Sequence, residues 1–287
     1  MSDAEKFTGV VANHGEGPFW DAPTRRFLMV DLLAGAIVAV ASDGIVTRHP
    51  VPSSVASVIR RRRSGGLVIA TEGGVVVCDE QFVEFRKFAD LALDPTVRTN
   101  DGGCGPSGDF FVGTMAFDGR PGGGALYRLT PEGRVVEMLG GVSISNGLQW
   151  SGDGSRVFYI DSLTHRVDVF DVDPESGEWF GRRPHIQIDD SSGVPDGMAI
   201  DEQDGLWIAL WGGGAVNHYD RTGRLVETVK VSGVSQVSSC AFGGVDRDVL
   251  YITTSRQGLS DDREPNAGAV FAFPTNVRGA VLPDFFG

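Results

Sequence analysis

Six short apolar segments recur along the chain at nearly constant spacing, and this repeat limits the fold more than any other feature. They begin at residues 27, 67, 110, 157, 206 and 249, so consecutive copies are 40 to 49 residues apart. Their sequences are FLMVD, LVIAT, FFVGT, VFYID, LWIAL and VLYIT. A period of this length is typical of the four-stranded blades of a β-propeller.

Turn-forming sequences precede every apolar segment, and further strand-like segments follow each one. The turns include DAPTRR, GPSGD and SGDGSR, and the later segments include AIVAVAS, VVVCD and ALYRLT. Helical periodicity is nearly absent, so the chain is predicted to be all-β. Six copies predict a single domain, a six-bladed β-propeller, over residues 1–287. The segment 7–12 is expected to pair with the last blade and close the ring.

The acidic composition excludes one large class of partners. The chain has 25 Lys and Arg against 38 Asp and Glu, which gives a formal net charge of −13. Nucleic-acid binding needs a basic face, so we expect no nucleic-acid partner. No apolar segment approaches the roughly 20 residues of a membrane helix, so no membrane partner is expected either. The basic run at residues 60–63 lies in the turn of the second unit and is expected to be solvated.

The N-terminal segment and the cysteines favour a cytoplasmic protein. Residues 1–10 lack the basic and apolar regions of a signal peptide. The three cysteines, Cys78, Cys104 and Cys240, are widely spaced along the chain. An odd and scattered set argues against a disulfide framework and against a CxxC zinc site.

Polar residues recur in register ten or eleven residues before the apolar segments, where the first strand of each unit begins. In a propeller these innermost strands surround the central channel. The residues at this position are Glu16, Ala56, Arg98 to Asn100, Asn146, Asp196 and Ser238. Asn-Gly and Asp-Gly are also turn formers, but turn formation alone does not explain the shared register. We therefore expect a polar rim around the channel.

This polar set has the chemistry of a site for a hard cation. Glu16 and Asp196 provide carboxylates, and Asn146 and Asn100 provide amide oxygens. Ca²⁺ and Mg²⁺ take oxygen ligands, and a cation would offset the cost of burying two facing carboxylates. Because His and Cys are missing from these positions, a His/Cys zinc site is not indicated. We expect one divalent cation, with Ca²⁺ favoured and Zn²⁺, Mn²⁺ or Mg²⁺ as alternatives.

Three further residues are candidates for contacts in the pocket. Arg98 could fix a hydroxyl, carboxylate or carbonyl oxygen of a substrate. Asp118 lies in a Gly-rich loop shortly after the third apolar segment and could bind substrate hydroxyl groups. His14 is two residues before Glu16 and is a candidate for lining the pocket.

Five segments resemble the SMP-30/gluconolactonase/regucalcin-like family, and they occur in family order over nearly the whole chain. They are GEGPFWD at 15–21, RTNDGGCGPSGDFFVGTM at 98–115, SNGLQWSGDGSRVFYIDS at 145–162, PDGMAIDEQDGLWIALWGGGAV at 195–216 and SSCAFGG at 238–244. The resemblance implies a six-bladed propeller with one divalent metal in the central channel. It implies metal ligands at Glu16, Asn146 and Asp196, and substrate contacts from Arg98, Asn100 and Asp118. Typical members hydrolyse sugar-acid lactones.

The favoured hypothesis is therefore a metal-dependent lactonase, a carboxylic ester hydrolase whose partner is a small-molecule lactone. The cation would polarise the lactone carbonyl and lower the pKa of a bound water. Asp196 would ligate the metal and act as the general base, while Arg98 and Asn100 would orient the ring oxygens. The alternatives are a phosphotriesterase on the same fold and a non-enzymatic calcium-binding or protein-interaction propeller.

Overall fold

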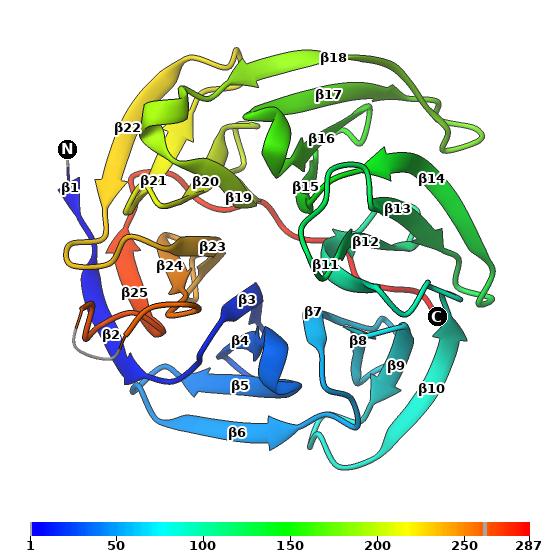
Figure 1. The fold of residues 1–287 in the computed structure, drawn as a ribbon, viewed down its shortest axis with the longest axis horizontal. Coiled ribbons are helices and arrows are strands. Elements are labelled where there is room, and N and C mark those ends of the chain that lie inside the picture. Colours follow the sequence, from blue (N-terminus) through cyan, green and yellow to red (C-terminus); the bar gives the residue numbers. More distant parts are fainter. Residues whose placement is uncertain (1, 261–262) are drawn as a thin grey trace.

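The computed structural model describes residues 2–260 and 263–287. Its strands form six sheets arranged in a ring around a central axis, as Figure 1 shows. The prediction of an all-β, six-bladed propeller is confirmed. Within the described residues, no helix has the length and apolar character needed to cross a membrane.

The blades follow one another along the chain. Blade 1 contains β3 (Gly15–Asp21), β4 (Arg26–Asp31), β5 (Ala36–Ala41) and β6 (Val46–Pro50). Blade 2 contains β7 (Ala56–Arg61), β8 (Leu67–Thr71), β9 (Gly74–Cys78) and β10 (Phe85–Asp90). Blade 3 contains β11 (Val97–Cys104), β12 (Phe110–Ala116), β13 (Gly124–Leu129) and β14 (Val135–Val142). Blade 4 contains β15 (Ser145–Trp150), β16 (Arg156–Asp161), β17 (Arg166–Val172) and β18 (Trp179–Gln187). Blade 5 contains β19 (Val194–Ile200), β20 (Leu206–Trp211), β21 (Ala215–Tyr219) and β22 (Leu225–Lys230).

Blade 6 is assembled from both ends of the chain, which closes the ring. Strands β23 (Val237–Gly243), β24 (Val249–Thr254) and β25 (Ala269–Pro274) are completed by β2 (Glu5–Val10) from the N-terminal region. Strand β2 is antiparallel to β25 and aligns Lys6 with Phe271. The closing role expected of residues 7–12 is therefore confirmed, although the strand starts two residues earlier. The short β1 (Ser2–Asp3) lies parallel to β22 at the edge of blade 5.

The core consists of six apolar clusters, one between each pair of neighbouring blades. Successive side chains of a strand point to opposite faces of the sheet, so the second strand of a blade packs against two neighbours. In β4, Leu28 and Val30 pack toward blade 2, whereas Phe27 and Met29 pack toward blade 6. Both faces of this strand are buried, which is why the repeated segments are continuously apolar rather than alternating.

The C-terminal segment after β25 crosses the ring on one side, as the red trace in Figure 1 shows. The N–H of Ala280 donates to the Ile200 carbonyl at 3.1 Å, and the N–H of Phe285 donates to the Arg61 carbonyl at 2.9 Å. Phe285 is fully buried within the cluster between blades 2 and 3. The segment therefore runs from blade 5 to blade 2 and forms a floor beneath the channel.

Candidate metal and active site

A break in β-pairing occurs near the start of all six innermost strands. The register between first and second strands shifts after residues 16, 56, 99, 146, 195 and 237. Such bulges re-aim side chains and are over-represented next to active sites. Glu16 and Asn146 are the last paired residues before their shifts, and Asp196 lies within the shift of β19. The shared register seen in the sequence is thus a ring of bulges around the channel.

The two proposed carboxylate ligands are buried together in this ring. Glu16 is 3% exposed and Asp196 is 6% exposed. Burial raises the pKa of Glu16 well above its usual value, and the negative charge of Asp196 raises it further. Burial likewise raises the pKa of Asp196, whereas a hydrogen bond from the Asn146 side chain and the charge of Arg98 lower it. Two acids in this position need a positive partner to stay ionised.

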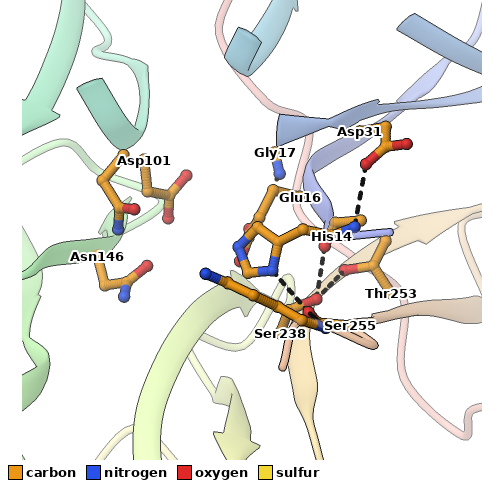
Figure 2. A network of polar contacts seen from close by, with 12 residues as sticks. His14, Glu16, Gly17, Asp31, Asp101, Asn146, Ser238, Thr253 and Ser255 are labelled. Carbon is orange, nitrogen blue, oxygen red and sulfur yellow. Dashed lines mark hydrogen bonds and ion pairs between the residues drawn. The ribbon is translucent and has the colours of Figure 1, made fainter. Parts of the chain in front are cut away.

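Asn146 completes an all-oxygen donor set that fits a cation. Its side chain is 4% exposed, and its Nδ2 donates to the Ser162 hydroxyl at 2.9 Å. Its Oδ1 is buried and accepts no hydrogen bond from the residues that the structure describes. An unpaired buried oxygen is costly, and a cation would satisfy it. Figure 2 shows Asn146 and Glu16 facing the same space from opposite sides.

The donor set is poor in the residue types that bind transition metals. Among residues 2–260 and 263–287, no cluster of three or more His, Cys, Asp or Glu side chains is placed to hold a metal ion. The proposed site has two carboxylates and one amide, which suits a hard cation completed by water molecules. The residues present therefore fit the cation expected from the sequence, while the identity of the ion stays a prediction.

Arg98 and Asn100 form one hydrogen-bonded unit beside the carboxylates. Arg98 Nη1 donates to the Asn100 Oδ1 at 2.8 Å and to the Thr99 carbonyl at 2.9 Å. The Asn100 Nδ2 donates to the Ser145 carbonyl at 2.9 Å. Both ends of the Asn100 amide are therefore occupied within the protein. Burial lowers the pKa of Arg98 to about 10, against the raising effect of Glu16 and Asp196, so the guanidinium stays charged at neutral pH.

Asp118 lies outside this buried cluster. It follows β12 in an exposed loop, where its side chain is 64% exposed and pairs with Arg120 at 3.2 Å. The loop leaves β12 at the end where Arg98 pairs with Met115, so Asp118 lies toward the same end of the channel as Arg98. The structure brings together Glu16, Asn146, Asp196, Arg98 and Asn100, and it leaves Asp118 at the surface.

A third channel carboxylate, Asp101, and a buried arginine, Arg60, were missed by the sequence interpretation. Asp101 lies within the bulge of β11 and is 5% exposed. Burial raises its pKa to about 6, and the charge of Arg60 opposes this. The position of Asp101 next to Asn100, in the same register as the other rim residues, is the sequence signal for it.

Arg60 was expected in a solvated hairpin, and this expectation is wrong. Its side chain is 7% exposed, and its guanidinium donates to the Gly17 carbonyl at 2.9 Å and the Gly102 carbonyl at 3.1 Å. Arg60 lies on β7, whose inward side chains face the ring axis, so it spans three innermost strands. With Asp101 it lines a small cavity of about 20 Å³ above the floor segment.

His14, the candidate for lining the pocket, is buried beside Glu16. Its Nδ1 is 2.7 Å from the Ser255 hydroxyl, a contact drawn in Figure 2. Its Nε2 is 3.9 Å from Glu16 Oε1. Burial, followed by the charge of Arg98, lowers the pKa of His14 to about 3. His14 is therefore neutral at neutral pH, and its contact with Glu16 is not an ion pair.

Comparison with known proteins identifies the family and agrees with the fold. The family model described as the SMP-30/Gluconolactonase/LRE-like region matches residues 14–256. Regucalcin of Gallus gallus is 38% identical over 287 residues and 95% of each chain is covered. YvrE of Bacillus subtilis (strain 168), provisionally named a sugar lactone lactonase, is 31% identical over 280 residues, again covering 95% of each chain. The crystal structure of a calcium-binding protein, regucalcin, from Agrobacterium tumefaciens str. C58 has a TM-score of 0.92 and 26% identity, covering 99% of this chain and 97% of that one. This chain belongs to the SMP-30/gluconolactonase/LRE-like family.

Proposed function

We propose that this protein is a single-domain, metal-dependent hydrolase that opens the ring of a lactone, most simply a sugar-acid lactone. The observation that carries the proposal is the cluster of two buried carboxylates, Glu16 and Asp196, with the unpaired oxygen of Asn146. Such a cluster is costly unless a cation binds it. The likeness to YvrE, provisionally named a sugar lactone lactonase, supports the choice of substrate.

Glu16, Asn146 and Asp196 would hold the cation through three oxygens. An all-oxygen set favours Ca²⁺, with Zn²⁺, Mn²⁺ and Mg²⁺ as alternatives. The likeness to an Agrobacterium protein described as calcium-binding supports Ca²⁺. When bound, the cation supplies Lewis-acid chemistry that polarises a carbonyl and acidifies water.

Asp196 would be the catalytic base of the reaction. Its carboxylate would take a proton from the attacking water, whose oxygen forms a bond with the lactone carbonyl carbon. The ring carbon–oxygen bond then breaks, and the proton passes to the departing ring oxygen. Burial and the charge of Asp101 raise the pKa of Asp196, whereas the Asn146 side chain and Arg98 oppose this rise. A bound cation would further favour the ionised form that a base requires.

Arg98 would hold the substrate, and Asn100 would hold Arg98. The hydrogen bonds of the Arg98 guanidinium to Thr99 and Asn100 use its Nη1. A guanidinium has five N–H donors, so others are available for lactone or hydroxyl oxygens. Asp118, on the exposed loop, would accept hydrogen bonds from hydroxyl groups at the outer end of a polyhydroxylated substrate.

A calcium-binding role without catalysis is the second candidate. The likeness to regucalcin from Gallus gallus and from Agrobacterium tumefaciens favours it. Either role is compatible with a cytoplasmic location, which the three free and buried cysteines favour.

A substrate panel under metal control distinguishes these roles. Sugar lactones, aliphatic lactones and organophosphates are assayed with chelated protein and with protein reloaded with each cation. Lactone hydrolysis that is lost on chelation and restored by a cation supports the proposal. Cation binding without turnover of any compound favours the calcium-binding role, and turnover of organophosphates alone favours a phosphotriesterase. Full lactonase activity in metal-free protein contradicts metal dependence.

A further inference from the structure

The fifth residue of the repeated apolar segment differs between blades in a regular way. It is Asp31, Thr71, Thr114, Asp161, Leu210 and Thr253 in blades 1 to 6. Aspartate thus occurs in blades 1 and 4, which lie opposite each other in a ring of six. These are the blades that present Glu16 and Asn146. In both, the aspartate ends the second strand and precedes a short 3-10 turn, η1 (Leu32–Ala34) or η2 (Ser162–Thr164).

Each aspartate binds the chain segment that leads into its own blade's innermost strand. Asp161 accepts the N–H of Ser143 on Oδ2 and the N–H of Ile144 on Oδ1, both at 3.0 Å. Asn146 is two residues further along. The Ser162 N–H donates to the Ile144 carbonyl at 3.0 Å. Three hydrogen bonds therefore hold residues 143–144 against residues 161–162.

Blade 1 repeats this arrangement with one change. Asp31 accepts the N–H groups of Asn13 at 3.1 Å and His14 at 3.0 Å, both on Oδ1. The Leu32 N–H donates to the His14 carbonyl at 2.8 Å. The second oxygen, Oδ2, pairs with Arg48 at 2.8 Å. Figure 2 shows Asp31 above His14 and Glu16.

The turn in blade 4 also orients the Asn146 amide. The Ser162 hydroxyl, 2% exposed, accepts from Asn146 Nδ2 at 2.9 Å. Together with the hydrogen bond from the Asn146 side chain to Asp196, this contact directs the Asn146 nitrogen into the protein and leaves Oδ1 as the unpaired atom. The equivalent residue in blade 1 is Leu32. The blade 1 ligand, Glu16, has a carboxylate with two equivalent oxygens, so it needs no such orientation.

We propose that Asp31 and Asp161 are positioning residues that hold the segments carrying Glu16 and Asn146, and that Ser162 turns the Asn146 oxygen toward the channel. This inference rests on the proposed cation site. Groups that orient metal ligands typically contribute about 10- to 100-fold to metal affinity. The two aspartates touch neither the cation nor the substrate in this scheme, so their effect would pass through the ligands.

The same substitution at the two aspartates gives different expected results. In Asp161→Asn, one oxygen becomes an NH₂ group, so one of the two backbone hydrogen bonds is lost in either amide orientation. In Asp31→Asn, Oδ1 keeps both backbone hydrogen bonds, and only the pair with the half-exposed Arg48 is lost. In calorimetric titration, Asp161→Asn should bind Ca²⁺ at least about 10-fold more weakly than wild type. Asp31→Asn should show a smaller loss of affinity.

Ser162 provides a milder test with a conservative rescue. Ser162→Ala should weaken Ca²⁺ binding by about 10-fold and leave the melting temperature of the metal-free protein nearly unchanged. Ser162→Thr keeps the hydroxyl and should restore binding. Wild-type affinity in both Asp161→Asn and Ser162→Ala overturns the inference, as does a loss in Ser162→Ala that Ser162→Thr does not repair.

A second measurement separates this inference from the proposed function. Amide hydrogen exchange of Ser143 and Ile144 in metal-free protein should be faster in Asp161→Asn than in wild type. If wild-type protein binds no divalent cation, the proposed function fails, and exchange alone decides whether Asp161 holds the segment. Unchanged exchange at both amides contradicts the positioning role.

Discussion

Arg98 donates a hydrogen bond to Asn100 across two residues of the same strand, at 2.8 Å, and both side chains are buried. Neither end of the Asn100 amide is free. In the proposed lactonase, the pair would therefore act as one unit, in which Arg98 contacts the substrate and Asn100 orients the Arg98 guanidinium.

Substitutions of this pair should be non-additive. Arg98→Met should raise KM for polyhydroxylated lactones and leave Ca²⁺ affinity nearly intact, because Arg98 is not a ligand. Asn100→Ala should give a smaller defect of the same kind, since it frees the guanidinium to move. The double variant should be no worse than Arg98→Met alone, which a double-mutant cycle on kcat/KM measures. Additive losses would mean that Asn100 contacts the substrate by itself, and an equal loss of Ca²⁺ binding in Arg98→Met would make Arg98 structural.

Removing one buried carboxylate should stabilise the metal-free protein in a pH-dependent way. The folded-state pKa of Glu16 is raised, so its stabilising protonated form is lost as pH rises above about 4.5 through the raised pKa. Glu16→Gln cannot ionise and escapes this loss. In chelator, its melting temperature should exceed that of wild type at pH 8, and the gap should shrink toward pH 4.5.

Saturating Ca²⁺ should reverse this order at pH 8, because wild type, with both carboxylates, binds the cation more tightly and gains more stability from it. Glu84→Gln, at an exposed position, is the matched control and should show the same difference from wild type at both pH values. A Glu16→Gln variant that melts below wild type at pH 8 without metal would contradict the electrostatic account.

Asp196 and Asn146 are both proposed ligands, but only Asp196 can take a proton near neutral pH. Asp196→Asn should lower kcat by about 10² to 10⁴-fold, the usual contribution of a general base, and the loss should persist at saturating metal. Asn146→Asp keeps an oxygen donor and should be milder. Turnover is measured across a metal titration, with spontaneous lactone hydrolysis subtracted. Rescue of Asp196→Asn to near wild-type turnover by excess metal would leave Asp196 as a ligand only.

Arg60 should matter for stability far more than Arg63, the exposed arginine of the same basic run. Arg60→Met leaves Asp101 buried without its positive partner and removes three hydrogen bonds to backbone carbonyls, which should cost about 3–5 kcal/mol of unfolding free energy. Arg63→Met removes an exposed guanidinium that lies 4.6 Å from the Phe286 ring centre and should cost below about 1 kcal/mol. Urea unfolding measures both. Adding Asp101→Asn to Arg60→Met should recover part of the loss, and equal effects at positions 60 and 63 would refute the buried role.

The repeat made the ring predictable, since apolar segments buried on both faces leave a strong signal in the sequence. The register of Glu16, Asn146 and Asp196 was visible for the same reason, because each bulge occurs at a fixed distance from its apolar segment. Both predictions need only the local sequence of each repeat and the number of residues between the rim position and the apolar segment.

Asp101 and Arg60 could not be assigned in this way. Their burial depends on which strands meet across the channel, and a run of four arginines in a turn is usually solvated. Arg60 is buried because it lies on β7, one residue before that strand ends at Arg61, and not in the turn that follows. Asp31 and Asp161 are visible in the sequence as the last residues of two apolar segments. Their contacts with the backbone N–H groups that precede Glu16 and Asn146 can be seen only in the structure.

The pairing of β2 with β25 aligns Lys6 with Phe271, so almost the whole chain separates one strand of blade 6 from the other three. A ribosome synthesises β2 long before its partner strand β25. Loop-closure entropy must be met before such distant contacts stabilise anything, which slows folding. During synthesis the N-terminal segment therefore waits unpaired, and Glu16, which follows it, joins its blade 5 partner Asp196 only after blades 2 to 4 have been made.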